Sequence, residues 1–169
     1  MDVTSPLLII SRDNLLAVES APGSDALFRR LANFSRRGIQ ILLTAPEPDH
    51  WLPTRGQVDD ALAAQGRLQA AVLESGGDLD GVYYVPKSSF TQDRNREGAL
   101  KDILERYGVT ADQAILLSSS RPFLRSARNL GITAHDIPKS KKGLSTLNEL
   151  LDTMTVPGGK PGKSLKTRD

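Results

Sequence analysis

Short runs of consecutive apolar residues alternate along the chain with longer stretches in which apolar residues recur every three to four positions. An unbroken apolar run of this length is too short for a membrane span and is typical of a strand buried in a parallel sheet. The first run, at residues 7–10, leads into a polar turn that contains Ser11 and Asp13. The pattern predicts five strands, at residues 7–10, 39–43, 82–85, 114–117 and 132–137.

The stretches between these runs have the 3.6-residue period of amphipathic helices. Ser24 is a predicted N-cap, Gly38 follows the end of the same helix, and Asn95 is a predicted cap of a later one. Thr54 and Gln57 have the spacing of a capping box. We expect helices at residues 25–37, 54–75, 95–107, 122–130 and 144–154, and loops at residues 45–53 and 86–96.

Two further local patterns predict a buried helix face and a short turn. The second helix should bury one face, made of Val58, Leu62, Leu68 and Val72. A second capping-box pattern at residues 110–113 (TADQ) predicts a short turn before the fourth strand.

Alternating strands and helices predict an α/β fold, a three-layer α/β/α sandwich around a mostly parallel five-stranded sheet. A chain of 169 residues suits one domain. After residue 155 the composition changes to Gly, Pro and Lys, which is typical of a flexible segment. We therefore expect one α/β domain at residues 1–155 and a flexible basic tail at residues 156–169.

The net charge of +2 is unevenly distributed along the chain. The tail carries +3, which leaves −1 for the first 155 residues, so the expected domain is not basic. No aromatic residue that could stack on a base lies among the lysines of the tail. A solubilising tail is the simpler interpretation, and a nucleic-acid-associated role of the tail stays open as an alternative.

The sequence contains no cysteine, which excludes disulfides and thiolate zinc sites and is compatible with a reducing cytosol. No segment approaches the roughly 20 apolar residues of a membrane-spanning helix. Met1 is followed by Asp2 rather than by the basic segment of a signal peptide. We expect a cytoplasmic protein without a membrane partner.

Polar side chains follow three of the predicted strands at the point where each strand ends. Ser11 and Asp13 follow the first, Thr44 ends the second, and Ser118 and Ser119 follow the fourth. In an open α/β sheet, ligands bind where the carboxyl ends of the strands meet the loops. These side chains are the candidate functional residues.

The order of these features resembles the haloacid dehalogenase (HAD) superfamily, closest to its small histidinol-phosphate and heptose-bisphosphate phosphatases. Residues 10–14 (ISRDN) stand where the family has a strand running into Asp-x-Asp-Gly, and Thr44 matches the Thr or Ser that ends its second motif. Residues 78–86 (DLDGVYYVP) are similar to the stretch before the zinc loop, and residues 127–131 (ARNLG) to the helix after the fourth motif. The resemblance spans residues 6–137 and implies a HAD-like Rossmannoid fold.

The resemblance also implies which chemistry is at stake. In such phosphatases the first Asp attacks phosphorus, and the second Asp is the general acid and base. A Thr or Ser and a Lys hold the phosphate oxygens, while Mg²⁺ is bound by the first Asp and an acid of the fourth motif. By this correspondence Ser11 replaces the nucleophile, Asp13 keeps the acid–base position, Thr44 keeps the phosphate hydroxyl and Arg94 stands at the Lys position.

Where the sequence departs from the family pattern, it lacks the family's acidic residues. Ser118 and Ser119 replace the Gly-Asp of the fourth motif, and Phe123 stands at the position of its second Asp. Val85 and Lys87 stand where a Cys and a His would begin the zinc site. Serines are poor replacements for the carboxylates that normally bind Mg²⁺. We therefore expect no cofactor and no zinc, with Mg²⁺ only if the protein is an enzyme.

These observations lead to three hypotheses for the function. The leading hypothesis is a catalytically degenerate HAD-like protein, a binding or protein-interaction module that can still recognise a phosphate or another anion through Thr44, Arg94, Ser118 and Ser119. Its partner would be a protein or a second copy of the chain. The first alternative is a weak or unusual phosphatase of sugar or small-molecule phosphates that uses Asp13 and Ser11. The second is a nucleic-acid-associated accessory protein that acts through the basic tail.

Overall fold

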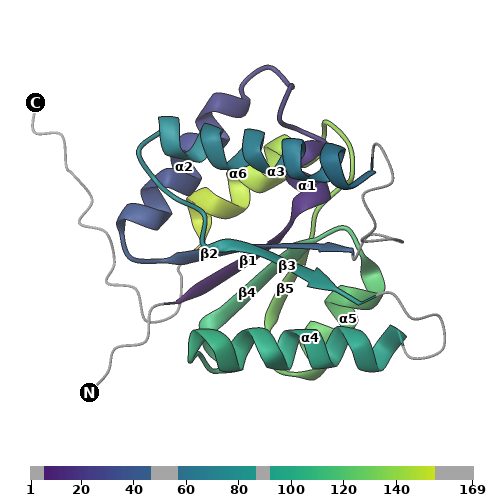
Figure 1. Ribbon diagram of the computed structural model, residues 1–169. Coiled ribbons are helices and arrows are strands. Elements are labelled where there is room, and N and C mark those ends of the chain that lie inside the picture. Colours follow the sequence, from purple (N-terminus) through teal and green to yellow (C-terminus); the bar gives the residue numbers. More distant parts are fainter. Residues whose placement is uncertain (1–5, 47–56, 87–91, 155–169) are drawn as a thin grey trace, which may run out of the picture.

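Five parallel strands form one sheet, in the order β3-β2-β1-β4-β5 (Figure 1). The computed structural model describes residues 6–46, 57–86 and 92–154. The strands are β1 (Leu7–Ser11), β2 (Gln40–Pro46), β3 (Gly81–Val85), β4 (Ala114–Ser118) and β5 (Thr133–Asp136).

Helices cover both faces of the sheet and make three layers (Figure 1). One face carries α1 (Arg12–Leu16), α2 (Ser24–Arg36), α3 (Gln57–Glu74) and α6 (Gly143–Thr153). The other face carries α4 (Gln92–Tyr107) and α5 (Arg121–Asn129), and a short 3₁₀ helix (Ala111–Gln113) leads into β4. None of the helices in the described ranges is long and apolar enough to cross a bilayer.

The side chains of β1 show why its sequence is continuously apolar. Leu8 and Ile10 belong to the core beneath α2, α3 and α6, whereas Leu7 and Ile9 belong to the core beneath α4 and α5. All four are fully buried. Successive side chains of a strand point to opposite faces, so a strand covered on both faces needs apolar residues at every position.

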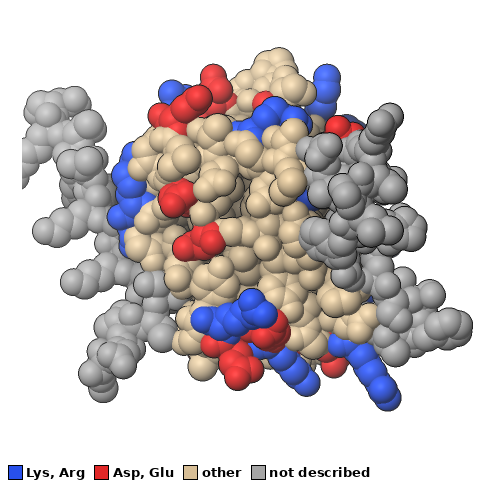
Figure 2. Space-filling model, in the orientation of Figure 1, with Lys and Arg blue, Asp and Glu red and all other residues tan. Residues whose placement is uncertain are grey.

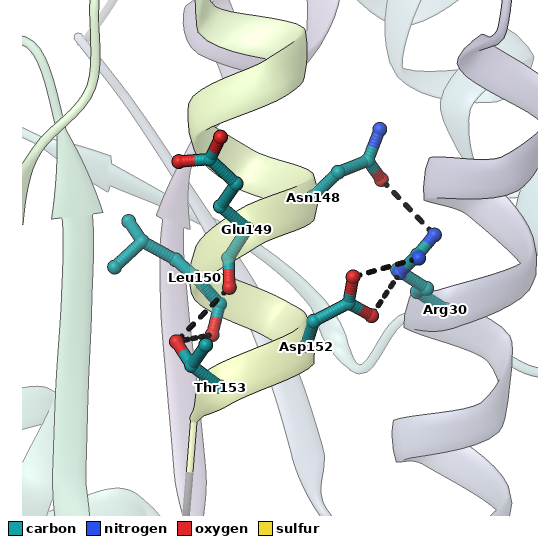
Figure 3. Close-up of polar contacts among 6 residues, drawn as sticks. All are labelled: Arg30, Asn148, Glu149, Leu150, Asp152 and Thr153. Atoms are coloured by element: carbon teal, nitrogen blue, oxygen red, sulfur yellow. Dashed lines mark hydrogen bonds and ion pairs between the residues drawn. The ribbon is translucent and has the colours of Figure 1, made fainter.

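A polar contact on the outer surface joins α2 to α6, although the two helices are far apart in the sequence (Figure 3). Arg30 donates from Nε to Oδ1 of Asp152 at 2.7 Å and from Nη2 to Oδ2 at 2.9 Å. Asn148 accepts a longer bond from the same guanidinium at 3.5 Å. The paired bonds fix how the two helices lie against each other, because a guanidinium and a carboxylate match in a planar fork.

The connections reverse direction at β1, and this reversal positions the site. From β1 the chain moves outward through β2 to β3, and then returns to the other side of β1 for β4 and β5. Ser11 at the end of β1 lies in register with Thr44 of β2, and Ile10 lies in register with Leu117 of β4. The carboxyl ends of three strands therefore meet at the switch point where α/β sheets bind ligands.

The predicted fold class is confirmed, with five strands and a three-layer sandwich. The sheet is parallel at every pairing. The capping box at Thr110 and Gln113 is also present as predicted. The Thr54 end of the other predicted capping box lies outside the described residues, as does the tail at residues 156–169.

Several details of the predicted helices are wrong. Ser24 is not the N-cap of α2: Gly23 takes that position with φ of 89°, and the Ser24 hydroxyl donates to the Glu19 carbonyl at 2.9 Å. Asn95 does not cap α4, because the helix begins three residues earlier and includes it. No Gly or Pro precedes Asn95 closely enough to delay the helix start.

The predicted buried face of α3 is only partly correct. Leu68 and Val72 are fully buried, but 56% of the Leu62 side chain is exposed. Leu62 lies about 120° around the helix from Leu68, which takes it off the stripe that faces the sheet. The side chain of Val58 is outside the described set.

Candidate functional site

A pocket of about 320 Å³ opens at the carboxyl ends of β1, β2 and β4. The structure brings together five of the six residues that the sequence nominates: Ser11, Asp13, Thr44, Ser118 and Ser119. An apolar wall completes the pocket, made of Ala45, Pro46, Val85, Pro86 and Phe123.

The ends of β1 and β4 are joined by their serine hydroxyls. Ser11 donates to Oγ of Ser118 at 2.7 Å, and the same oxygen accepts from the backbone N–H of Ser120 at 3.1 Å. A hydrogen bond between two hydroxyl groups uses the hydrogen of one hydroxyl and leaves the hydrogen of the other available. The pair therefore retains one hydroxyl hydrogen that a ligand oxygen could accept.

Asn14, which follows β1, bonds to the segments that follow β4 and β5. Its side-chain oxygen accepts from the backbone N–H of Ser119 at 3.1 Å and from the Ser119 hydroxyl at 3.3 Å. Its amide nitrogen donates to the carbonyl of Ile137, just after β5, at 3.2 Å. Asn14 is 1% exposed, so this one amide satisfies buried groups on two loops and ties the first strand to the last two.

Thr44 is a buried polar residue on the wall of the pocket. The residue is 3% exposed and lines the pocket, and its hydroxyl makes no hydrogen bond to any residue in the described ranges. Buried hydroxyls are normally satisfied. A Thr44 hydroxyl that faces the pocket therefore has a donor and acceptor available for a ligand.

The charges around the pocket are more basic than acidic. Asp13 lines it with 37% of its side chain exposed, and Nη2 of Arg12 lies 3.5 Å from Oδ1 of that carboxylate. Arg96 and Lys139 also line the pocket. With two cations and one carboxylate on its lining, the pocket suits an anion better than a cation.

Arg94 does not reach the pocket. Arg94 is exposed on the first turn of α4, and Arg96 lines the pocket in its place. The phase of the helix explains the difference: Arg96 is four residues before Leu100 and seven before Ile103, both fully buried, whereas Arg94 points about 200° away from Arg96. That spacing was available in the sequence and could have identified Arg96.

Sequence reasoning missed two further pocket residues. Asn14 stands at the Gly position of the family's first motif, and its bridging role needs partners more than 100 residues away. Lys139 comes from the loop after β5, where no periodic pattern indicates its direction.

No protein-family model matches the sequence, and no curated protein matches it. Solved structures do match the fold. The D,D-heptose 1,7-bisphosphate phosphatase of B. bronchiseptica, solved with magnesium and phosphate, has a TM-score of 0.62 at 20% identity, covering 92% of this chain and 90% of that one. The corresponding enzyme of Burkholderia thailandensis has a TM-score of 0.55 at 18% identity, covering 84% and 85%. The core domain of a phosphoglycolate phosphatase homologue from Streptococcus pneumoniae has a TM-score of 0.53 at 16% identity, covering 89% and 97%.

This chain has a HAD-like fold. The identities are too low to carry an activity across, so the similarity concerns the fold alone. It does confirm the expected HAD-like architecture.

The donor set of the pocket does not fit Mg²⁺. Magnesium is bound through oxygen ligands that normally include one or two carboxylates. Asp13 is the one carboxylate among the residues that line the pocket, and it faces Arg12. Within the described ranges, no three His, Asp or Glu side chains come together as a metal-binding group.

Phe123 contributes part of the apolar wall of the pocket. It is 6% exposed, packs in the core beneath α4 and α5, and also lines the pocket. Its backbone N–H is capped by the Ser120 hydroxyl at 3.4 Å, which begins α5. The first turn of α5 is thus satisfied by its own N-cap residue.

Proposed function

We propose that this chain is a HAD-fold binding module that recognises a phosphate or another small anion and does not hydrolyse it. The observation that carries the proposal is the hydrogen bond between Ser11 and Ser118. It joins the ends of β1 and β4 directly, at the two positions where catalysis in this fold depends on carboxylates and a cation.

The loss of catalysis follows from the groups present. A serine nucleophile needs a base, and the nearest carboxylate, Asp13, is held beside Arg12 at 3.5 Å. Phosphoryl transfer depends on positioning and on neutralising charge at the phosphoryl group, which the fold normally does with Mg²⁺. Removing a catalytic nucleophile costs on the order of 10⁶ in turnover in a well-studied hydrolase.

Anion binding is supported by the donors that line the pocket. The Thr44 hydroxyl, one hydroxyl hydrogen of the Ser11–Ser118 pair, and the side chains of Arg96 and Lys139 all border the same pocket. Hydrogen bonds from charged donors to a phosphate are roughly twice as strong as neutral ones. The apolar wall leaves space for an organic group attached to the anion.

The test is a titration of the full chain with inorganic phosphate and with a sugar phosphate, with and without Mg²⁺, by calorimetry. Binding should be unchanged by chelation of metal, and Thr44→Val or Lys139→Ala should weaken it about tenfold or more. Arg94→Ala is the matched control and should leave affinity unchanged, because Arg94 is exposed outside the pocket. Hydrolysis of phosphate esters that disappears in Asp13→Ala would refute the proposal.

The phosphatase alternative depends on Asp13, which stays half-exposed in the pocket. Restoring acids with the double substitution Ser11→Asp and Ser119→Asp separates the two functions. A weak enzyme would gain on an activity it already has. A binding module would show activity only in the double variant, if at all.

A further inference from the structure

Strand β3 is an edge of the sheet, and within residues 6–46, 57–86 and 92–154 the strand beside it is β2. The backbone N–H of Asp80 donates to Ile41 of β2 at 2.8 Å, which fixes the alternation along the strand. Backbone groups of successive residues point to opposite sides. Val82 and Tyr84 therefore face β2, and the N–H and C=O groups of Gly81, Tyr83 and Val85 face outward.

The opposite edge of the sheet is covered. On β5, Nη2 of Arg128 donates to the carbonyl of Ala134 at 3.0 Å, and Asp136 places an exposed carboxylate at the strand end. Charged side chains on an edge are a common way to prevent strand pairing. Strand β3 contains no charged residue.

The surface beside this free edge is apolar. Leu62 and Leu73 of α3 are the two large apolar side chains that stand exposed in the described structure, at 56% and 53%. Both lie on the side of α3 towards β3, the side from which Gln65 accepts a hydrogen bond from the Tyr84 hydroxyl at 3.0 Å. In Figure 2, which looks onto the β3 edge, the surface between α3 and α4 is uncharged apart from acidic side chains at its left.

We propose that a second copy of this chain occupies the free edge, with β3 of each copy paired antiparallel around a two-fold axis at Tyr83. Three outward-facing residues are spaced symmetrically about Tyr83, so a two-fold axis there pairs Tyr83 with its own copy and Gly81 with Val85 of the second copy. The two five-stranded sheets become one continuous sheet of ten strands.

The side chains on both faces are self-complementary under the same axis. On the α3 face, the axis directs Leu62 of one copy towards Leu73 of the other. On the α4 face, Asp102 accepts from the Tyr83 hydroxyl at 2.6 Å, and Arg106 lies 5.6 Å from the centre of the same ring. Asp102 and Arg106 already form an ion pair within one chain at 3.1 Å. Because α4 and its copy run antiparallel about this axis, the pair of one copy would meet the reversed pair of the other, so that opposite charges face each other.

The oligomeric state of the full chain tests this directly, by sedimentation over a range of concentrations. We expect a dimer whose dissociation constant rises at least tenfold in Leu73→Glu and in Leu62→Lys. The double variant Leu62→Lys with Leu73→Glu should recover affinity, because the opposite charges meet across the axis. Ala63→Glu is the control: Ala63 is exposed on the same helix, about 100° further from the β3 edge.

Amide hydrogen exchange tests the strand register independently. The N–H groups of Tyr83 and Val85 should become protected as the protein concentration rises, whereas those of Val82 and Tyr84, already bonded to β2, should not change. A chain that stays monomeric throughout overturns the proposal. A dimer with Tyr83 and Val85 unprotected, or one equally sensitive to Ala63→Glu and Leu73→Glu, also overturns it.

Discussion

The side-chain oxygens of Ser11 and Ser118 lie 2.7 Å apart, although the two residues are 107 positions apart in the sequence. This contact joins the end of β1 to the end of β4. Ser118 is 1% exposed and also accepts from the backbone of Ser120, so its hydroxyl satisfies buried groups on two elements.

Ser118→Ala should therefore destabilise the fold by about 1–3 kcal/mol, the cost of leaving buried groups without partners. Chemical denaturation measures the loss. In the same experiment, Mg²⁺ or a chelator should leave the free energy of unfolding of the wild-type chain unchanged, since no stabilisation by metal binding is expected. A clear gain in stability on addition of Mg²⁺ would contradict this account.

Replacing Asn14 should destabilise the fold more than the size of its side chain suggests. Asn14→Ala removes the acceptor of the Ser119 N–H and the donor to the Ile137 carbonyl, and both groups lie at the buried junction of three strands. We expect a loss of about 2–4 kcal/mol, because two partners are orphaned at once. Asn148→Ala is the control: Asn148 is partly exposed and makes one 3.5 Å bond, so its loss should be within about 0.5 kcal/mol.

The features that the sequence predicted best are those that depend on residues close together along the chain. The apolar run of β1 is buried on both faces, and the capping box at Thr110 depends only on residue spacing, so both could be inferred locally. Thr44 and Ser118 were identified because strand ends share one edge of a parallel sheet.

What could not be predicted depends on contacts between distant segments. The direction of Lys139 is set by the loop after β5, and the bridge made by Asn14 needs β4 and β5 in place. Leu62 is apolar but exposed, and periodicity alone cannot separate a core position from an exposed apolar one.

Two glycines should respond to alanine in opposite ways. A Cβ at Gly77 would lie 2.4 Å from the Cα of Ala32, so Gly77→Ala must displace the backbone of α2 and should strongly reduce the Tm. Gly66 lies inside α3, and a Cβ there meets no atom within 4 Å. Gly66→Ala should raise stability by up to about 1 kcal/mol, because alanine is the better helix former. Equal effects of the two substitutions in thermal unfolding would contradict the packing described for Gly77.

Tyr83 should titrate at unusually high pH. Burial, and then the hydrogen bond to Asp102, raise the pKa of Tyr83 from its ordinary 10.0 to about 12. The same contact, followed by Arg106, lowers the pKa of Asp102. In an absorbance titration of tyrosinate, the difference between the wild type and Tyr83→Phe should therefore appear near pH 12 rather than near 10.

The sign of the linked stability follows from these directions. The folded state favours neutral Tyr83, so its contribution is fully present below about pH 10 and is lost as the pH rises through about 12. Asp102 is favoured as the carboxylate, so its contribution is present above its ordinary pKa and is lost as the pH falls. Asp102→Asn removes the charge but keeps an acceptor, and should move the Tyr83 transition part of the way back towards pH 10. A Tyr83 transition that does not move in Asp102→Asn would show that burial alone sets its pKa.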